Sequence, residues 1–473
     1  MPPFRPIEMI VSTDVETLDP RHATDAVSLR ATRLVHAGLV RLDPDSLAPL
    51  PYAAKAWTWL DTQTLRLELR DDVRFHSGAP LRPADVVATL RAFASKEVGS
   101  RHGRVIEAIE SVREDGPFAV VVTLKRPHAT LLTDLELPIL RADEAFSAPR
   151  PLGDLDGLGP YRVARFVSGQ VDLEPAPSAR ALVGSAPRAV TIRVVHDENA
   201  RALRLHAGRA DVALKVLTQT LVPAMQKAPG LSVASRRGAN LTYLVMRADK
   251  GPFADARTRR AVSLALDRVL IAKTLFAGRA QPASTLIAPA HWAHTPAPPI
   301  RFDPDEARRL LRAAGVRHVS LVTSTDRLRS SVARVVAQEL SDVGLEIDVT
   351  PLELGTMLAR LGAGDFEMAT MQLPEMTEPN VLRVFLHSTS IPPGGANRGR
   401  VRDEEVDRLL DEGDSVTDRD ARRAIYATLE ARVRDGAWIL PLWHEDQVVV
   451  TSARARAFVP SAEGRWLGLT AVE

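Results

Sequence analysis

The pattern that most constrains the fold is a strand, a helix and a second strand in succession, which occurs twice in distant parts of the chain. The first copy spans residues 190–217 and reads "VTIRVV", "ENARALRLHAG" and "DVALKVL". The second spans 318–352, where Val332, Val336 and Leu340 recur at helical spacing between the strands "HVSLVTS" and "LEIDVTPL". Strand–helix–strand units with short connections are typical of α/β folds.

A complete set of helix-end signals precedes the second copy, in "FDPDEARRLLRAAG". Asp303 is the expected N-cap, Pro304 the first helical residue, Glu306 the capping-box partner and Gly315 the terminator. The sequence therefore predicts a helix between Pro304 and Gly315.

Residues 41–160 are richer in strand patterns, among them "TLRLELR" and "FAVVVTLKR", the second preceded by the turn Asp115-Gly116. Pro83 opens a helix between these strands. Near the C-terminus, "WILPLWHEDQVVVTS" indicates a buried strand, a turn and another strand. Two α/β regions and a β-rich region predict a protein of several lobes, whose ligand site lies in a crevice.

Composition excludes several classes of function. The chain has 473 residues, enough for two to four domains, and its formal charge is only +2. That balance predicts no binding to nucleic acid. Cysteine is absent, which rules out disulfides, thiol nucleophiles and cysteine-ligated metals. We see no secretory leader in "MPPFRPIEMIVSTDVETLDP" and no apolar run long enough to span a bilayer.

The common catalytic motifs are missing: we find no phosphate loop, G-x-G-x-x-G turn, G-x-S-x-G elbow or H-E-x-x-H helix. His291 and His294 have a spacing that could ligate a metal, but their proline-rich surroundings favour a solvated loop. His76 has no acid or nucleophile nearby in sequence and is interpreted as a structural residue at the end of a hairpin. We therefore expect neither an enzyme, nor a cofactor, nor a metal site.

Three short segments carry side chains that could bind a ligand. Trp443 and His444 are either a core tryptophan with a surface histidine, or they line a crevice, where Trp443 supplies an aromatic ring and His444 a hydrogen-bonding group. Glu375 is either an ordinary loop carboxylate or the partner of a cationic ligand group. Arg398, beside Asn397, is either solvated surface or a bidentate clamp for an anion.

The order of motifs along the chain resembles one family, the extracytoplasmic solute-binding proteins of ABC importers for dipeptides, oligopeptides and nickel (family 5). The motifs that carry this resemblance are "TLDP", "LRDDVRFHSGAPLRPADVVATL", "GLGPYRVARF", "VVHDENARALRLHAGRADVAL", "PFADARTRRAVSLALDRVLI", "FDPDEARRLLRAAG", "VAQELSDVGLEIDV" and "GDFEMA". They are spread over nearly the whole chain.

The resemblance implies a periplasmic-binding-protein-like α/β fold (class II, cluster C), with two α/β lobes joined by a hinge and an inserted β-rich lobe. Mapped onto this chain, lobe I comprises residues 1–40, 160–238 and 447–473. Lobe II comprises residues 41–159, and lobe III, which closes over the ligand, comprises 239–446.

The resemblance also implies site residues. Thr24 and Asp25 correspond to a segment that lies along the ligand. The family's Trp-x-x-Asp, which holds a peptide's amino terminus, corresponds to "QLPE", so that Gln372 replaces the aromatic residue and Glu375 the aspartate. The candidate ligand-binding residues are thus Thr24, Asp25, Met371, Gln372, Glu375, Asn397, Arg398, Trp443 and His444.

The implied function is the capture of a peptide-like or other small polar solute between lobes I and III by hinge closure, followed by delivery to an ABC permease. We expect an extracytoplasmic monomer that acts by population shift. The alternative is a relative that passes its ligand to a receptor in sensing or regulation rather than to a permease.

Overall fold

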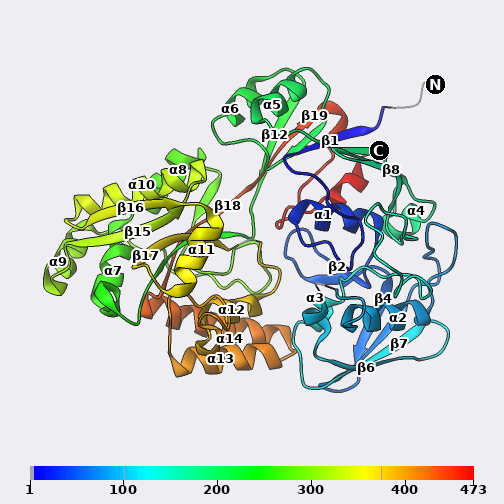
Figure 1. Cartoon of the computed structure of the whole chain (residues 1–473), viewed down its shortest axis with the longest axis horizontal. Coiled ribbons are helices and arrows are strands. Elements are labelled where there is room, and N and C mark those ends of the chain that lie inside the picture. The colour runs from blue at the N-terminus through cyan, green and yellow to red at the C-terminus, as the bar shows by residue number, and fades with distance from the viewer. Residues whose placement is uncertain (1–4, 101, 374, 473) are drawn as a thin grey trace. The chain divides into compact units, whose positions relative to one another are not determined.

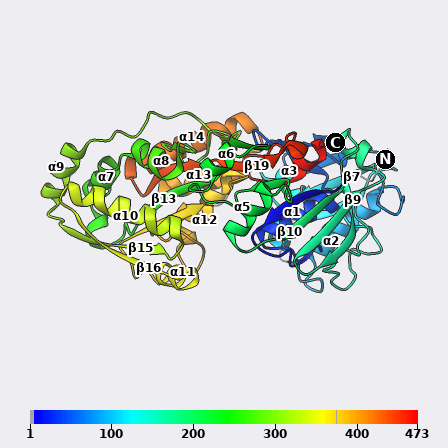
Figure 2. The ribbon, with the colours of Figure 1, turned by 90° about the horizontal axis from the view of Figure 1, so that it is seen from above.

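The chain forms two compact units in the computed structural model, which describes residues 5–100, 102–373 and 375–472. Unit 1 comprises Met1–Arg236 and Gln447–Glu473, and unit 2 comprises Arg237–Asp446. In Figures 1 and 2, blue and cyan elements from the first half of the chain share unit 1 with the red C-terminal segment, whereas unit 2 runs from green to orange. The chain therefore passes between the units twice.

A seven-stranded sheet organises the first part of unit 1, in the order β12-β19-β11-β1-β10-β9-β8. Central strand β1 pairs in parallel with both β10 and β11. The predicted strand–helix–strand unit at 190–217 is present, but β1 from the N-terminus lies between its two strands. The strands are β1 (Ile7–Val11), β8 (Tyr161–Val167), β9 (Gln170–Pro175), β10 (Val190–Val194), β11 (Val212–Leu214), β12 (Leu231–Arg236) and β19 (Gln447–Ser452).

A four-stranded antiparallel sheet, in the order β4-β5-β7-β6, builds a second core within unit 1. Along β5, Leu65, Leu67 and Leu69 are fully buried while the residues between them are partly exposed, the alternation expected of a half-buried strand. Helix α2 begins at Pro83 as predicted, and its Val86, Leu90 and Phe93 join this core. The elements are β4 (Ala54–Trp59), β5 (Thr64–Leu69), β6 (Ile109–Glu114), β7 (Ala119–Leu124) and α2 (Pro83–Ala94).

Short elements complete unit 1. Strands β2 and β3 form a small antiparallel pair, and helix α1 packs on the seven-stranded sheet through Ala31, Leu34 and Val35. These elements are α1 (Ala26–Val35), β2 (Val40–Leu42), β3 (Pro49–Pro51), α3 (Leu131–Asp134), α4 (Ala179–Val183), α5 (Glu198–His206) and α6 (Val222–Lys227), with 3-10 turns at Gly103–Ile106, Ala453–Ala455 and Leu467–Ala471.

Unit 2 is built on a six-stranded mixed sheet in the order β14-β18-β13-β17-β15-β16. Strands β15 and β16 pair in parallel through α10, which confirms the second predicted strand–helix–strand unit. The strands are β13 (Leu241–Met246), β14 (Ala280–Pro282), β15 (His318–Ser324), β16 (Glu346–Leu352), β17 (Met368–Leu373) and β18 (Ile439–Glu445).

Helices flank this sheet and supply most of its core partners. They are α7 (Ala256–Ala265), α8 (Arg268–Phe276), α9 (Pro304–Ala314), α10 (Arg327–Asp342), α11 (Leu354–Ala363), α12 (Leu382–Leu386), α13 (Glu404–Ser415) and α14 (Arg419–Gly436), with 3-10 turns at Gly251–Ala254, Pro379–Val381 and Ser388–Ser390. Within the described residues, no helix has both the length and the apolar character needed to cross a bilayer.

The helix predicted between Pro304 and Gly315 is confirmed as α9. The Asp303 carboxylate accepts a hydrogen bond from the Glu306 backbone N–H at 2.9 Å, and Gly315 ends the helix with a left-handed φ of 69°. The expected capping-box role of Glu306 is wrong, because its carboxylate instead pairs with Arg309 one turn later, at 2.6 Å. Residues three apart lie on the same face of a helix, which explains why Glu306 pairs with Arg309.

The strand, turn and strand at the C-terminus are present, but their pairing could not be read from the pattern. Strand β18 joins the unit 2 sheet, and β19, which begins two residues later, joins the unit 1 sheet. The short connection between β18 and β19 is therefore one of the two places where the chain crosses from one unit to the other. The division into three lobes with boundaries near 41, 159 and 239 stays a prediction.

Candidate ligand-binding site

Thr24 and Asp25 lie at the beginning of α1 in unit 1. Asp25 is the N-cap, and its Oδ1 accepts hydrogen bonds from the backbone N–H groups of Val27 at 3.0 Å and Ser28 at 2.8 Å. This cap satisfies two of the amides that a helix start leaves unpaired. Thr24 is exposed beside it. The Asp25 carboxylate therefore has a structural task, and Thr24 presents its hydroxyl at the positive end of a helix.

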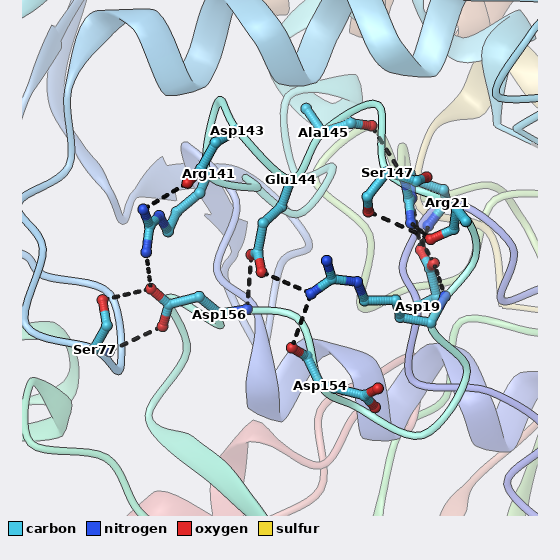
Figure 3. Close-up of polar contacts among 12 residues, drawn as sticks. Asp19, Arg21, Ser77, Arg141, Asp143, Glu144, Ala145, Ser147, Asp154 and Asp156 are labelled. Atoms are coloured by element: carbon cyan, nitrogen blue, oxygen red, sulfur yellow. Dashed lines mark hydrogen bonds and ion pairs between the residues drawn. The ribbon is translucent and has the colours of Figure 1, made fainter.

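The loop that leads into α1 is held by Arg21, whose side chain is fully buried. All five N–H donors of its guanidinium are used (Figure 3). Two bind the Asp19 carboxylate, at 2.9 and 2.6 Å, and three bind the carbonyls of Ala145, Ser147 and Ala148, at 3.1, 2.7 and 3.3 Å. The loop is thereby fastened to a segment more than a hundred residues away.

Asp19 is equally buried and accepts further hydrogen bonds from the backbone N–H groups of Arg21 and Arg150, both at 3.0 Å. Burial raises the pKa of Asp19, but the hydrogen bonds from Arg21 and Arg150 outweigh it and hold the pKa below its usual value. Asp19 is thus a buried carboxylate that stays charged because its partners satisfy it.

Figure 3 shows that this contact continues into a wider polar network. Arg150 pairs with Glu144 at 3.0 Å, and Glu144 accepts the backbone N–H of Asp156 at 2.9 Å. The Asp156 carboxylate in turn binds the Ser77 hydroxyl at 2.5 Å and the Arg141 guanidinium at 3.3 Å. The network joins three stretches of unit 1 that are remote in sequence.

His76, next to this network, is half-buried and donates from Nε2 to the carbonyl of Gly159 at 3.0 Å. Burial lowers the pKa of His76. Its own backbone N–H binds the Gly157 carbonyl at 2.9 Å. These contacts are those of a residue that ties two loops together, as the structural interpretation of His76 expects.

Two further side chains fasten the backbone of the Thr24 loop. The Ser100 hydroxyl donates to the Arg21 carbonyl at 2.9 Å, and His102 Nε2 donates to the Ala23 carbonyl at 2.7 Å. Burial lowers the pKa of His102, which keeps the ring neutral near neutral pH. The backbone just before Thr24 is therefore held by side chains of residues 100 and 102.

Glu375 belongs to a loop of unit 2 that is also held from several sides. The Met376 N–H donates to the Ala239 carbonyl at 3.0 Å, and the Thr377 carbonyl accepts from His291 Nε2 at 3.2 Å. Glu378, three residues after Glu375, forms a buried ion pair with Arg422 of α14 at 2.9 Å. Glu375 itself is half-buried. The backbone that follows Glu375 is thus held by hydrogen bonds at Met376 and Thr377.

The interpretation of His291 as part of a solvated loop is wrong. His291 is only 3% exposed, and burial lowers its pKa to about 3. The neighbouring Trp292 ring lies under the guanidinium groups of Arg419 and Arg422, at 5.0 and 5.1 Å from its centroid. Residues 291–293 are therefore packed between α14 and the Glu375 loop, whereas the prolines that follow, Pro296, Pro298 and Pro299, are exposed.

His294, the other member of the pair, is half-buried and donates from Nδ1 to the Ile287 carbonyl at 3.0 Å. Both ring nitrogens of His291 are engaged, Nε2 with the Thr377 carbonyl and Nδ1 with the Ala293 N–H at 3.0 Å, so this ring has no nitrogen left for a metal ion. In the part of the chain that the structure describes, no group of three or more His, Cys, Asp and Glu side chains could hold a metal ion.

Gln372 lies on β17 and points into a polar cluster. Its Nε2 donates to Glu445 Oε1 at 3.2 Å, and the same oxygen accepts from Thr242 Oγ1 and from Arg329 Nη1, both at 2.9 Å. Sequence reading missed Arg329 and Glu445. Their only signal is that Glu445 follows the Trp443-His444 pair, and nothing in the sequence connects it with Arg329.

Met371 and Gln372 cannot present their side chains to the same side of the sheet. Gln372 pairs opposite Thr242 and Met371 opposite Tyr243, and successive residues of a strand face opposite sides. Tyr243 is buried. Burial raises its pKa, while the nearby charge of Arg398 opposes that rise. Met371 therefore lies beside Tyr243, on the face away from Gln372.

Trp443 and His444 are both buried, at 0% and 1% exposed. Trp443 packs against Phe276 with ring centroids 5.2 Å apart, which agrees with the core alternative. His444 is not on the surface, so that part of the same alternative is wrong: its Nδ1 donates to the Asn240 carbonyl at 2.6 Å. Burial lowers the pKa of His444 to about 4.

Asn397 and Arg398 differ in how much they can offer a ligand. Asn397 is fully buried, and its amide binds the carbonyls of Leu386, His387 and Val401 at 3.0, 3.0 and 2.9 Å. It holds the loop in shape. Arg398 is half-buried, and its Nε has no hydrogen-bond partner among the described residues.

The comparisons with known proteins agree on one family. The model of bacterial extracellular solute-binding proteins, family 5 Middle, matches residues 48–391. The probable di/tripeptide-binding protein 5 of Pseudomonas aeruginosa (strain UCBPP-PA14) is 24% identical, covering 90% of this chain and 88% of its own length. The glutathione-binding protein GsiB of Salmonella typhi is 24% identical, covering 96% and 91%.

Solved structures resemble this fold over almost its full length. NikA from Brucella suis, in complex with Fe(III)-EDTA, superposes with a TM-score of 0.87 at 22% identity, covering 98% of this chain and 99% of that one. DppA from Helicobacter pylori, in complex with the peptide STSA, gives 0.77 at 20% identity, covering 98% and 97%. The predicted periplasmic-binding-protein-like α/β fold is thereby confirmed.

Proposed function

Because this chain belongs to the family 5 bacterial extracellular solute-binding proteins, we propose that it captures a small peptide-like solute by its protonated amine and delivers it to an ABC permease. The family consists of non-catalytic solute-binding components of ABC importers that act outside the cytoplasm. That role is the role of this chain, and the corresponding predictions from the sequence are confirmed. The ligand's amine, the binding residues and the permease contact are the new parts of the proposal.

The observation that carries the proposal is the ordered carboxylate loop of unit 2. Glu375 is half-buried in a backbone held by Ala239, His291 and the Glu378–Arg422 pair. A carboxylate on a rigid support binds an ammonium group without first losing conformational entropy. Two of the similar proteins are described as di/tripeptide-binding and glutathione-binding, and those ligands carry a free amine.

The other candidate residues enter the proposal in different roles. Thr24 contributes its exposed hydroxyl, and Arg398 takes the anionic group of the ligand. Asp25, Asn397 and His444 support the loops and strands around them, since each is already engaged with backbone groups. Hinge closure about the two chain passages stays part of the proposal, as do ligand contacts by Met371 and Gln372. Trp443 is buried in the core of unit 2 and supports the strand that carries it.

The test compares alanyl-alanine with N-acetyl-alanyl-alanine by isothermal titration calorimetry, on the wild-type chain and on Glu375→Gln. A hydrogen bond between charged groups is worth about 1.5–3 kcal/mol, so losing it weakens binding roughly 10- to 150-fold. We expect that loss for the acetylated peptide on the wild type and for the free peptide on Glu375→Gln. Glu346→Gln, an exposed change on β16, is the control and should bind as the wild type does.

Equal binding of the free and acetylated peptides would refute the role of the amine, and unchanged binding by Glu375→Gln would refute the role of that carboxylate. The permease is tested separately, by uptake of the labelled dipeptide in cells with and without this chain. Uptake that does not depend on the chain would favour the sensory or regulatory alternative.

A further inference from the structure

Unit 1 contains a cavity of about 460 Å³ that the proposed peptide site does not use. It lies at the C-terminal end of α1, between β2 and the segment 457–471. Arg33 on its wall is nine residues beyond Thr24, a rise of about 14 Å along an α-helix. The volume is within the usual range of small-molecule pockets, roughly 300–1,000 Å³.

The wall of the cavity carries more positively than negatively charged side chains. Four arginines line the cavity, Arg33, Arg41, Arg236 and Arg465, against two glutamates, Glu136 and Glu463. Arg236 forms an ion pair with Asp45 outside the wall, and Arg465 pairs with both glutamates. Arg33 reaches Glu136 only at 3.5 Å, and its buried Nε has no hydrogen-bond partner in the part of the chain that the structure describes.

The positive charges are also crowded. Burial lowers the pKa of Arg465, and the charges of Arg33 and Arg30 lower it further. The pKa of Arg33 is lowered by burial too, against the opposing effect of Glu463. Arg41 has no carboxylate partner among the described residues and instead lies 6.0 Å from the centroid of the Tyr52 ring. The guanidinium groups of Arg33 and Arg465 repel each other, and an anion beside them reduces the repulsion.

The rest of the wall is apolar or carries a donor. Leu42, Leu182, Val183 and Trp466 supply aliphatic and aromatic surface. Tyr52 is only 5% exposed, and its hydroxyl has no partner among the described residues. A buried hydroxyl without an acceptor is unfavourable, which a bound oxygen atom would correct.

We propose that this cavity is a second ligand site, which binds a small organic anion carrying a carboxylate or a phosphate on an apolar body. Arg33 and Arg41 hold the anionic group, because they are the cations whose charge the wall leaves least satisfied. The Tyr52 hydroxyl donates to the same group or to the atom next to it. The apolar body of the ligand lies against Leu182, Val183 and Trp466.

The site is tested on the full chain at low salt by calorimetry with four probes: benzoate, phenyl phosphate, inorganic phosphate and benzyl alcohol. We expect saturable 1:1 binding of benzoate or phenyl phosphate, at least tenfold weaker binding of inorganic phosphate, and no saturable binding of neutral benzyl alcohol. Affinity should fall as salt rises. Whichever of the two aromatic anions binds more tightly identifies the head group.

Variants then locate the site. Arg41→Gln and Arg33→Gln should each lower the affinity for the aromatic anion at least tenfold. Glu375→Gln, in unit 2, should leave the affinity for this anion unchanged. Arg162→Gln, an exposed arginine paired with Glu174, is the matched control. Thermal melting verifies that the variants fold, and the comparison of benzoate with benzyl alcohol on the wild type needs no variant.

The proposal is overturned if none of the anions saturates below about 10 mM, if benzyl alcohol binds as well as benzoate, or if both arginine variants of the cavity bind like the wild type. None of these results bears on the peptide site, because that site is measured with a different ligand and a different variant.

Discussion

Replacing Arg21 with methionine should destabilise the fold of unit 1 by about 3–5 kcal/mol, the usual cost of removing one partner from a buried ion pair. Arg21 and Asp19 are 0% and 1% exposed, and five hydrogen bonds leave the guanidinium. Methionine fills much of the same volume, so the loss is electrostatic: a buried carboxylate and three carbonyls are left without their donor.

The same reasoning predicts a rescue. In Asp19→Asn/Arg21→Met the uncompensated charge is gone, so the double variant should be more stable than Arg21→Met alone. The control is Arg162→Met, which breaks an ion pair whose side chains are 53% and 49% exposed. Pairs this exposed contribute less than about 1 kcal/mol.

The pH dependence has a definite sign. In the wild type the pKa of Asp19 lies below its usual value, so its pair contributes stability above the unfolded pKa, about 3.9, and loses it as the pH falls through the folded value. In Arg21→Met, burial without a partner raises that pKa. The gap in stability between the two proteins should therefore narrow as the pH is lowered from 7 towards 4.

The assay is urea denaturation followed by circular dichroism, together with hydrogen exchange of the peptides that cover residues 18–28. Arg21→Met should shift the urea midpoint and speed exchange in that loop, while Arg162→Met does neither. The reasoning would be refuted if Arg21→Met lowered the free energy of unfolding no more than Arg162→Met does. It would also be refuted if Asp19→Asn/Arg21→Met were no more stable than Arg21→Met.

The remaining predictions concern unit 2. Burial raises the pKa of Glu430 to about 7. The stabilising contribution of the protonated carboxyl is therefore fully present below the unfolded pKa, about 4.3, and is lost by up to ~1.4 kcal/mol per pH unit as the pH rises to the folded value. Glu430→Gln keeps an acceptor for the Leu286 and Ile287 N–H groups but cannot titrate. The melting temperature of this variant should therefore change less between pH 5 and 8 than that of the wild type; an equal change would contradict this. Gly413→Ala places a methyl 2.8 Å from the Tyr426 ring and should cost about 1–3 kcal/mol. Gly362→Ala, on an open helix face, should be neutral or slightly stabilising in the same urea titration.

Sequence reading succeeded where the interactions are local. The α9 cap depends on Asp303, Pro304 and Gly315, all within one short segment, and the β15–α10–β16 unit depends on periodicity within 35 residues. The family followed from the order of many motifs along the chain. Each of these inferences needs only neighbours in sequence, whose contacts are set by helix and strand geometry.

The surroundings of the candidate site were decided by tertiary structure. Arg21 meets carbonyls about 125 residues away, His291 meets Thr377, and Gln372 meets Glu445. Adjacent strands β18 and β19 join different sheets. His291 and His444 looked like surface residues because polarity in sequence says nothing about which loop will cover them.

From its sequence alone, this protein's family, its α/β class and its local helix signals could be determined. The tertiary structure alone decided which polar side chains hold loops in place, such as Asp25, Asn397 and Arg21, and which stay exposed, such as Thr24. The physical reason is that a buried polar group must find a partner, and that partner is supplied by whichever remote segment packs against it.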